Sequence, residues 1–254
     1  MGSFDLKGHI SNLVKLRHFL VPIDELTSIF EVGKLEFLQE LRKFNVTNVK
    51  GFELSQLGKL TELGGSLEIS DLEEVQTKEE AVAAKLMHKS RLHELKLEWN
   101  TDDWRKKDLI HEQDVLESLR PHSNLRHLCI RGHGGISCPT WLGANLCVKN
   151  LESLKLDNVP WKELPPLGEL FLVDESGIEH MGCIQSQIFH NLKRLELTKV
   201  RRLRKWVVSC PHSVSHPTSM VESSCVRNVP CNLFVHLEVL IIQYCPELSV
   251  VPVS

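Results

Sequence analysis

A glycine run and one nearby cysteine are the first residues in this chain whose types suggest catalysis. Gly132-His133-Gly134-Gly135 has the composition of an oxyanion-binding loop, but no G-x-S-x-G motif supplies the nucleophile that such a loop would serve. Cys129 lies just upstream with no base beside it in the sequence, and a thiol needs a neighbouring base or cation to become an effective nucleophile. We interpret the glycine run as a turn and predict no catalytic residue.

A second group of side chains has the donor types of a metal site. Its members are Cys210, His212, His216, Cys225 and Cys231. No two of the eight cysteines are separated by only two residues, so the paired spacing of zinc ribbons and redox motifs is missing. The stretch is rich in serine, proline and valine, which favours an inserted loop near 207–232 over a metal centre. We predict no metal and no cofactor.

The composition excludes several classes of protein. The 254 residues carry a formal net charge of -3, with 42% hydrophobic and 25% charged residues, which is typical of a folded domain without a basic field for nucleic acid. No stretch approaches the ~18 apolar residues of a membrane span, and no basic segment precedes an apolar run at the start, as a secretory signal requires. We therefore expect a cytoplasmic protein with reduced cysteines.

Leucine occupies about 40 positions and recurs with a period. The form LxxLxL, or a close variant with other apolar residues, occurs about nine times, mostly at the ~20–29-residue spacing of leucine-rich repeats. The copies are Leu16-Phe19-Val21, Leu41-Phe44-Val46, Gly64-Leu67-Ile69, Leu92-Leu95-Leu97, Leu125-Leu128-Ile130, Leu151-Leu154-Leu156, Leu167-Leu170-Leu172, Leu192-Leu195-Leu197 and Leu237-Leu240-Ile242. Chance matches in a leucine-rich helix do not keep such a register, so we predict a repeat array.

Each copy predicts one strand of a stacked sheet. The x-Leu-x-Leu-x segment alternates, so its leucines point inward and stack against those of neighbouring repeats. Parallel strands need returning segments on the opposite side, and the clearest ones are helices over 78–89 and 111–120. Thr77 and Glu80 form a capping box for the first helix, in which Val82 and Leu86 share one face. In the second helix, Val115, Leu116 and Leu119 are predicted to point inward.

The predicted fold class is therefore α/β, in the form of a leucine-rich-repeat solenoid. We expect a curved single domain over 1–254, with parallel strands on the concave face and irregular loops and short helices on the convex face. Repeat arrays need polar caps at their ends, and none is visible before Leu13 or after Val253. The isolated chain is expected to fray or aggregate at its ends.

Several stretches also resemble a known family. Their sequences are similar to the leucine-rich-repeat region of plant intracellular nucleotide-binding immune receptors of the coiled-coil class. The similar stretches are 12–19, 38–44, 57–67, 92–99 and Cys245-Pro246-Glu247-Leu248. The resemblance implies a region that recognises pathogen effectors and holds its receptor inactive. The chain lacks the G-x-x-x-x-G-K-[ST] phosphate loop of a complete receptor, so nucleotide binding does not carry over. We expect a fragment or a truncated paralogue.

Recognition by such a solenoid would use the residues that alternate with the core leucines. The candidate concave binding residues are Glu94, Lys96, Glu98, Trp99, His127, Arg131, Lys155, Asp157, Arg194, Glu196, Lys199, Gln243 and Tyr244. A basic run supplies a candidate docking patch at Arg201, Arg202, Arg204 and Lys205. A solvated surface without a ligand is the alternative interpretation of both sets, and a nuclear-targeting or nucleic-acid patch is a further alternative for the second.

These features predict a non-catalytic module that binds proteins. The expected partners are a pathogen effector or a host protein and, in a complete receptor, its own nucleotide-binding domain; no nucleic acid and no membrane span are expected. The alternative is a free-standing repeat scaffold or adaptor.

Overall fold

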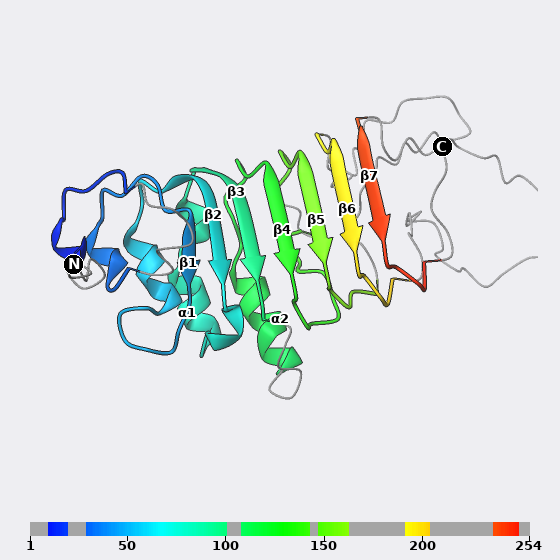
Figure 1. Ribbon diagram of the computed structural model, residues 1–254, viewed down its shortest axis with the longest axis horizontal. Helices are drawn as coiled ribbons and strands as arrows, with labels where there is room; N and C mark the ends of the chain where they lie inside the picture. Colours follow the sequence, from blue (N-terminus) through cyan, green and yellow to red (C-terminus); the bar gives the residue numbers. More distant parts are fainter. Residues whose placement is uncertain are drawn as a thin grey trace, which may run out of the picture.

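The computed structural model of the protein describes residues 10–19, 29–100, 108–142, 147–162, 191–203 and 236–248. In these residues, seven parallel strands form one open sheet in which strand order follows chain order. The strands are β1 (Lys43–Asn45), β2 (Gly64–Ser70), β3 (Arg91–Glu98), β4 (His127–Arg131), β5 (Ser153–Asp157), β6 (Arg194–Thr198) and β7 (Val239–Gln243). All of them point the same way across the molecule (Figure 1).

The returning segments contain two α-helices and several short 3₁₀ helices, with α1 and α2 behind the sheet in Figure 1. The helices are η2 (Ile10–Asn12), η3 (Val32–Lys34), η4 (Leu54–Lys59), η5 (Leu72–Glu74), α1 (Lys78–Ala83), η6 (Leu86–His88) and α2 (Leu109–Ser118). α1 packs against both η4 and α2. This arrangement is the predicted α/β leucine-rich-repeat solenoid.

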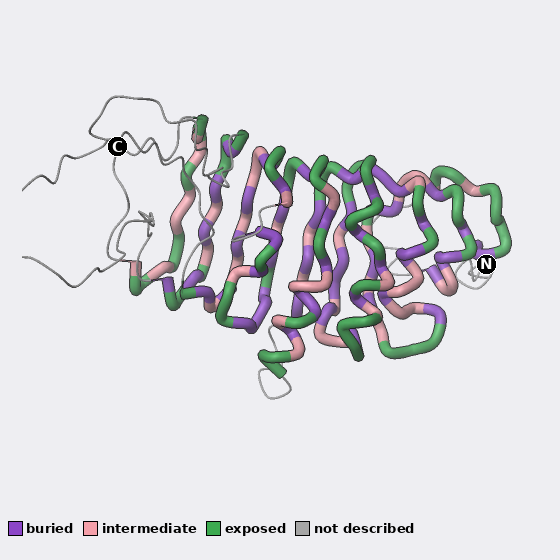
Figure 2. The backbone as a smooth tube through the Cα atoms, turned by 180° about the vertical axis from the view of Figure 1, so that it is seen from behind, coloured by how far each residue is buried: buried purple, intermediate pink, exposed green. Residues whose placement is uncertain are grey.

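The leucine rows form one continuous core between the sheet and the helices. In the first row, Leu95 of β3 pairs with Leu128 of β4, and the register continues through the leucines of β5 and β6. The predicted inward leucines at 95, 97, 154, 156, 195 and 197 are all fully buried in a single hydrophobic cluster. Figure 2 shows buried and less buried positions alternating along the strands. The prediction of one stacked leucine core is confirmed.

The first helix is shorter than predicted, and its Val82 side chain is exposed instead of packed inward. The Thr77 hydroxyl accepts a hydrogen bond from the Glu80 amide at 3.1 Å, as a capping box requires. The Glu80 carboxylate, however, accepts from the amides of Gln76 and Leu54. The helix ends at Ala83 instead of Lys89, so Leu86 turns inward on η6 while Val82 stays 59% exposed. The predicted shared apolar face is wrong because the helix stops between these two residues.

The second predicted helix is α2, which begins two residues earlier than expected. Asp108 caps it by accepting hydrogen bonds from the amides of Ile110 and His111. Val115, Leu116 and Leu119 are buried as predicted.

A left-handed residue follows most strands. The positions are Asp71 after β2, Gly132 after β4, Asn158 after β5, Lys199 after β6 and Tyr244 after β7, with φ between 54° and 76°. The Gly132, Asn158 and Lys199 amides each donate a hydrogen bond to the last residue of the next strand. The hydrogen-bond ladder between these strands therefore continues for one residue beyond each strand, before the chain turns toward the helices.

The predicted repeat copy at 167–172 and the predicted inserted loop near 207–232 fall outside the described residues. The first predicted copy is described only over 16–19, which form no strand, because Val21 also lies outside. The single-domain organisation over 1–254 stays a prediction. Among the described helices, none combines the length and apolar character that crossing a membrane requires.

Candidate interaction surface

The solvent side of the sheet, here called the strand face, carries the side chains that alternate with the buried leucines. It is the surface that the sequence predicted as a binding face. Ten of the predicted residues lie within β3–β7 at its alternating positions: Glu94, Lys96, Glu98, His127, Arg131, Lys155, Asp157, Arg194, Glu196 and Gln243. Two others, Lys199 and Tyr244, are exposed in the left-handed turns after β6 and β7.

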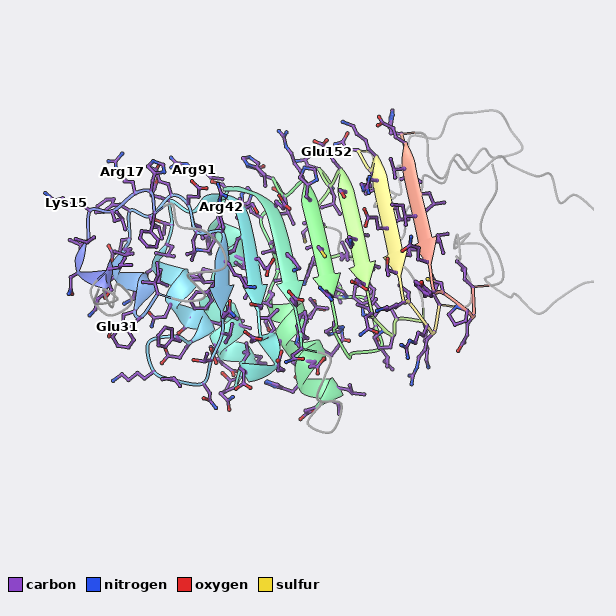
Figure 3. All side chains as sticks on the ribbon, viewed as in Figure 1. Lys15, Arg17, Glu31, Arg42, Arg91 and Glu152 are labelled. Carbon is purple, nitrogen blue, oxygen red and sulfur yellow. The ribbon has the colours of Figure 1, made fainter. Side chains whose placement is uncertain are left out.

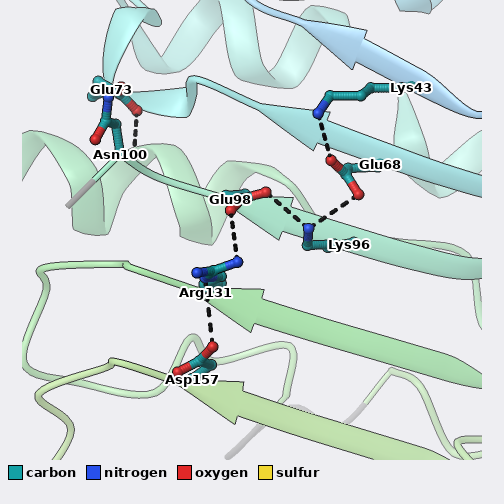
Figure 4. A network of polar contacts seen from close by, with 8 residues as sticks. All are labelled: Lys43, Glu68, Glu73, Lys96, Glu98, Asn100, Arg131 and Asp157. Carbon is teal, nitrogen blue, oxygen red and sulfur yellow. Dashed lines mark hydrogen bonds and ion pairs between the residues drawn. The ribbon is translucent and has the colours of Figure 1, made fainter. Parts of the chain in front are cut away.

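Ion pairs cross the strand face from β1 to β3. Glu68 on β2 lies 2.9 Å from the Lys43 ammonium on β1 and 3.0 Å from Lys96 on β3, which in turn lies 2.9 Å from Glu98 (Figure 4). Partial burial raises the pKa of Glu68, but hydrogen bonds from Lys43 and Lys96 outweigh it, so the pKa is lowered overall. Burial lowers the pKa of Lys96, but hydrogen bonds to Glu98 and Glu68 have the larger opposite effect, so the pKa of Lys96 is raised overall. Glu68 and Lys96 are thus held in their charged forms.

The same chain of charges continues to β5. Arg131 on β4 lies 3.2 Å from Glu98 and 3.5 Å from Asp157 on β5 (Figure 4). Charges of alternating sign therefore connect β1 to β5. This arrangement follows from the register, because Glu98, Arg131 and Asp157 occupy equivalent positions in consecutive strands.

A second group of ion pairs joins β5 to β6. Glu196 lies 3.0 Å from the Lys155 ammonium and 2.5 Å from the Arg194 guanidinium. Burial raises the pKa of Glu196, but hydrogen bonds from Lys155 and Arg194 lower it by more. The Glu196 side chain is 13% exposed, whereas Lys155 and Arg194 are 44% and 45% exposed. The cations therefore remain accessible to a partner while the carboxylate beneath orients them.

Cys129 separates the two charged groups on β4. It lies in register between Lys96 and Lys155, and burial raises the pKa of its thiol to about 11 despite these cations. The thiol is therefore protonated at neutral pH and is a poor nucleophile.

The prediction that Trp99 lies on the binding surface is wrong. This residue follows β3 directly, but its side chain is only 1% exposed and packs edge-on against His133 with ring centroids 5.0 Å apart. The indole N–H of Trp161 donates to Nδ1 of the same histidine at 3.2 Å. Trp99 therefore belongs to an aromatic cluster in the core, because the chain turns inward after β3.

The glycine run after β4 forms a packed turn. The Gly134 amide donates to the buried Glu112 carboxylate at 2.6 Å, and a Cβ on Gly134 would lie 2.7 Å from a methyl group of Leu109. Its amide is thus already bonded within the fold, and a side chain at this position would displace the side chain of Leu109 or Glu112.

The predicted basic patch is described only in part. Arg201 and Arg202 are exposed beyond the turn after β6, and Leu203 beside them is fully buried. Arg204 and Lys205 lie outside the described residues, as do the cysteines and histidines at 210–231. Where side chains are described, no three histidine, cysteine or acidic residues gather as metal ligands would.

A hollow of about 700 Å³ at the starts of β1–β3 is a feature that sequence reasoning missed. Its lining residues are His18, Gln39, Glu40, Arg42, Glu62, Gly64, Gly65, Ser66, Leu67, Glu68, Arg91, Glu94 and Lys96. Arg42 and Arg91 lie at this end of the strands in Figure 3. The feature of the sequence that could have predicted this hollow is Gly64-Gly65 at the start of β2, where most copies of the repeat have a leucine.

Comparison with known proteins assigns the repeats to a family. Residues 54–181, which run from η4 past β5, match the family model described as R13L1/DRL21 LRRs. The chain belongs to this leucine-rich-repeat family. The match spans the β2–β5 segment that carries most of the strand-face ion pairs.

Similar curated proteins are plant disease resistance proteins. A putative disease resistance protein RGA1 from Solanum bulbocastanum is 38% identical over 176 residues, which is 69% of this chain and 17% of that protein. Disease resistance protein RGA2 from the same plant is 39% identical over 142 residues, covering 54% of this chain and 14% of the relative. A putative disease resistance RPP13-like protein 1 from Arabidopsis thaliana is 28% identical over 232 residues, covering 81% and 20%. The chain therefore spans at most about a fifth of these relatives.

Proposed function

We propose that this chain is a non-catalytic protein-binding module of a plant immune receptor that helps to recognise pathogen effectors and to hold the receptor inactive. The observation that carries the proposal is the family match over residues 54–181, together with disease resistance proteins as relatives. The expected partners are an effector or a host protein and, within a receptor, its nucleotide-binding domain. The expected location is the cytoplasm.

The strand face suits selective binding of a protein surface. Its charges are oriented by one another before any partner arrives, which lowers the entropy cost of binding. Alternating signs favour a partner with the complementary pattern and disfavour others, because mismatched charges cost several kcal/mol. Tyr244, which is 76% exposed, adds an aromatic side chain of the type that often anchors interfaces.

The test is a chimera that carries this chain in place of the matching segment of the RGA2 relative. In it, Lys155→Glu, Arg194→Glu and Glu196→Arg are introduced together. This triple reversal keeps both internal ion pairs but inverts the charge that a partner meets. We expect pathogen-induced or spontaneous cell death in leaves to change while the protein level stays constant.

The matched control reverses a pair elsewhere in the fold. Glu31 and Lys34 form an ion pair at η3, and Glu31→Lys with Lys34→Glu should leave both responses unchanged. If the triple reversal and the control behave alike in both assays, recognition through the strand face is refuted.

A further inference from the structure

The hollow at the starts of β1–β3 is formed by missing side chains and by an irregular register. Gly64 cannot carry a Cβ, which would lie 2.8 Å from the Arg91 Cβ, whereas a Cβ on Gly65 would meet nothing within 4 Å. The β2–β3 register shifts between Gly65 and Ser66, so that Ser66 pairs with Glu94. Bulges of this type re-aim side chains and are common beside binding sites. Here the bulge places Ser66 and Glu94 side by side in the hollow.

The charges that line the hollow are balanced except for one. Arg42 pairs with Glu40 at 3.0 Å, Arg91 pairs with Glu62, and Lys96 bridges Glu68 and Glu98 on the strand face. Glu94 also lines the hollow and is exposed, but it has no ion-pair or hydrogen-bond partner. The hollow therefore carries one uncompensated carboxylate.

The size and position of the hollow fit a polypeptide partner. Its volume of about 700 Å³ is within the range of sites that enclose a ligand and exceeds what a single ion needs. It is continuous with the strand face, because Glu68 and Lys96 belong both to its lining and to the ion pairs that cross β1–β3. A partner on the strand face would thus place a loop at the hollow.

We propose that this hollow is a recognition pocket for an arginine or lysine side chain projecting from a loop of a protein partner, with Glu94 as its counter-charge. The inference rests on the proposed function, since it specifies what a partner of the strand face presents. The Ser66 hydroxyl beside Glu94 adds a hydrogen-bond acceptor for the incoming cation. The pairs Arg42–Glu40 and Arg91–Glu62 form a charged rim that does not compete for the cation.

The test is an NMR titration of the whole chain at pH 7.5 and low salt with four capped amino acids. The probes are the Nα-acetyl amides of arginine, lysine, citrulline and glutamate. We expect saturable shifts at the amides of Gly64, Gly65 and Ser66 with the two cations and none with neutral citrulline or with glutamate. Glu94→Gln should weaken binding of the arginine probe roughly tenfold, because it removes a charged hydrogen-bond partner.

Two further variants separate a binding defect from a folding defect. Glu36→Gln removes the same charge at an exposed residue outside the hollow and should leave binding unchanged. Ser66→Phe should fill the hollow and abolish the shifts while the remaining spectrum stays that of the folded chain.

The inference is overturned if no probe binds at these amides, if the glutamate probe binds instead, or if Glu94→Gln binds arginine as tightly as the unmodified chain. These binding measurements are independent of the cell-death assays that test the proposed function. If the arginine probe binds but the chimera shows no strand-face effect, the hollow is a basic-side-chain site and recognition through the strand face is refuted.

Discussion

Lys89 connects consecutive repeats through a buried amine. It is 1% exposed, and its Nζ donates to the carbonyl oxygens of Leu57 at 2.7 Å and Leu60 at 2.9 Å, at the end of η4. Each carbonyl also accepts a backbone amide, Leu57 from Leu60 and Leu60 from Leu63, so the buried amine gives each oxygen a second hydrogen bond and finds its own partners there. Burial, with a smaller contribution from Lys85, lowers the pKa of Lys89 from 10.5 to about 8. A neutral amine still has two N–H groups for these two carbonyls.

Stability should therefore depend on pH through Lys89. Between pH 8 and 10.5 the unfolded chain binds the proton that the folded chain has lost, so this residue's contribution to the free energy of unfolding rises with pH. The difference between the unmodified chain and Lys89→Met in urea unfolding should grow by at most about 1.4 kcal/mol per pH unit in this window. Lys149→Met, at an exposed turn lysine, should show no such growth. A pH-independent difference for Lys89→Met would contradict the prediction.

At the scale of the elements, the turns after five of the seven strands repeat one backbone conformation with unequal side chains. Left-handed φ suits glycine and asparagine, as at Gly132 and Asn158, but costs other residues about 1 kcal/mol or more. Lys199 and Tyr244 adopt it at φ 54° and 55°. These two turns therefore store strain, and both side chains are candidate contacts on the strand face.

Relieving this strain should stabilise the fold. Lys199→Gly should raise the free energy of unfolding by about 0.5–1 kcal/mol, because glycine adopts this conformation without a steric cost. Lys149→Gly, at a turn position outside the left-handed region, should instead lower stability through backbone entropy. Denaturant unfolding measures both changes. A loss of stability in Lys199→Gly would show that contacts of the lysine outweigh the backbone strain.

The ion pairs between strands allow a second test at this scale. Replacing Glu196 by Gln should cost about 1 kcal/mol at pH 7, because two cations lose a partly buried partner. The lowered folded-state pKa of Glu196 means that this stabilisation is complete above its unfolded value near 4.5 and is lost as pH falls through the folded value. The two chains should thus converge in stability in acid. A cost that does not diminish as the pH falls would assign the effect to packing.

At the scale of the whole molecule, the leucine core is continuous but not uniformly buried. Equivalent leucines at the inward row are fully buried in β5 and β6, whereas Leu240 of β7 is 41% exposed. Because repeat proteins gain stability from contacts between neighbouring repeats, burial at each position sets the local contribution. We expect β3–β5 to hold the most stable part of the described array.

Paired truncations compare these positions directly. Leu154→Ala should cost about 2–5 kcal/mol, as cavities in a closed core do, whereas Leu240→Ala should cost roughly 1 kcal/mol because much of its side chain already meets water. Amide hydrogen exchange should follow the same order, with β5 more protected than β7. Equal costs for the two truncations would mean that the array unfolds without regard to local burial.

Periodicity in the amino-acid sequence predicts the repeat, the strands β1–β7 and the core rows. Alternation of leucine with polar residues specifies which side of a strand is buried, and a recurring spacing stacks these sides into one core. Leu95 and Leu154 could therefore be placed without any knowledge of long-range contacts. The strand-face positions followed from the same alternation, since whatever lies between inward leucines must face solvent.

Contacts between repeats depend on the tertiary structure and could not be predicted from the sequence. The partners Glu68 and Lys96, or Lys155 and Glu196, are set by the register between strands, which depends on how each returning segment packs. Trp99 follows the alternating segment, so its burial depends on the distant His133 instead of on a local pattern. The hollow at Gly64-Gly65 likewise exists because the register shifts beside these glycines. Periodicity acts within a strand, whereas a pocket or an ion pair requires the relative positions of residues that lie a full repeat apart.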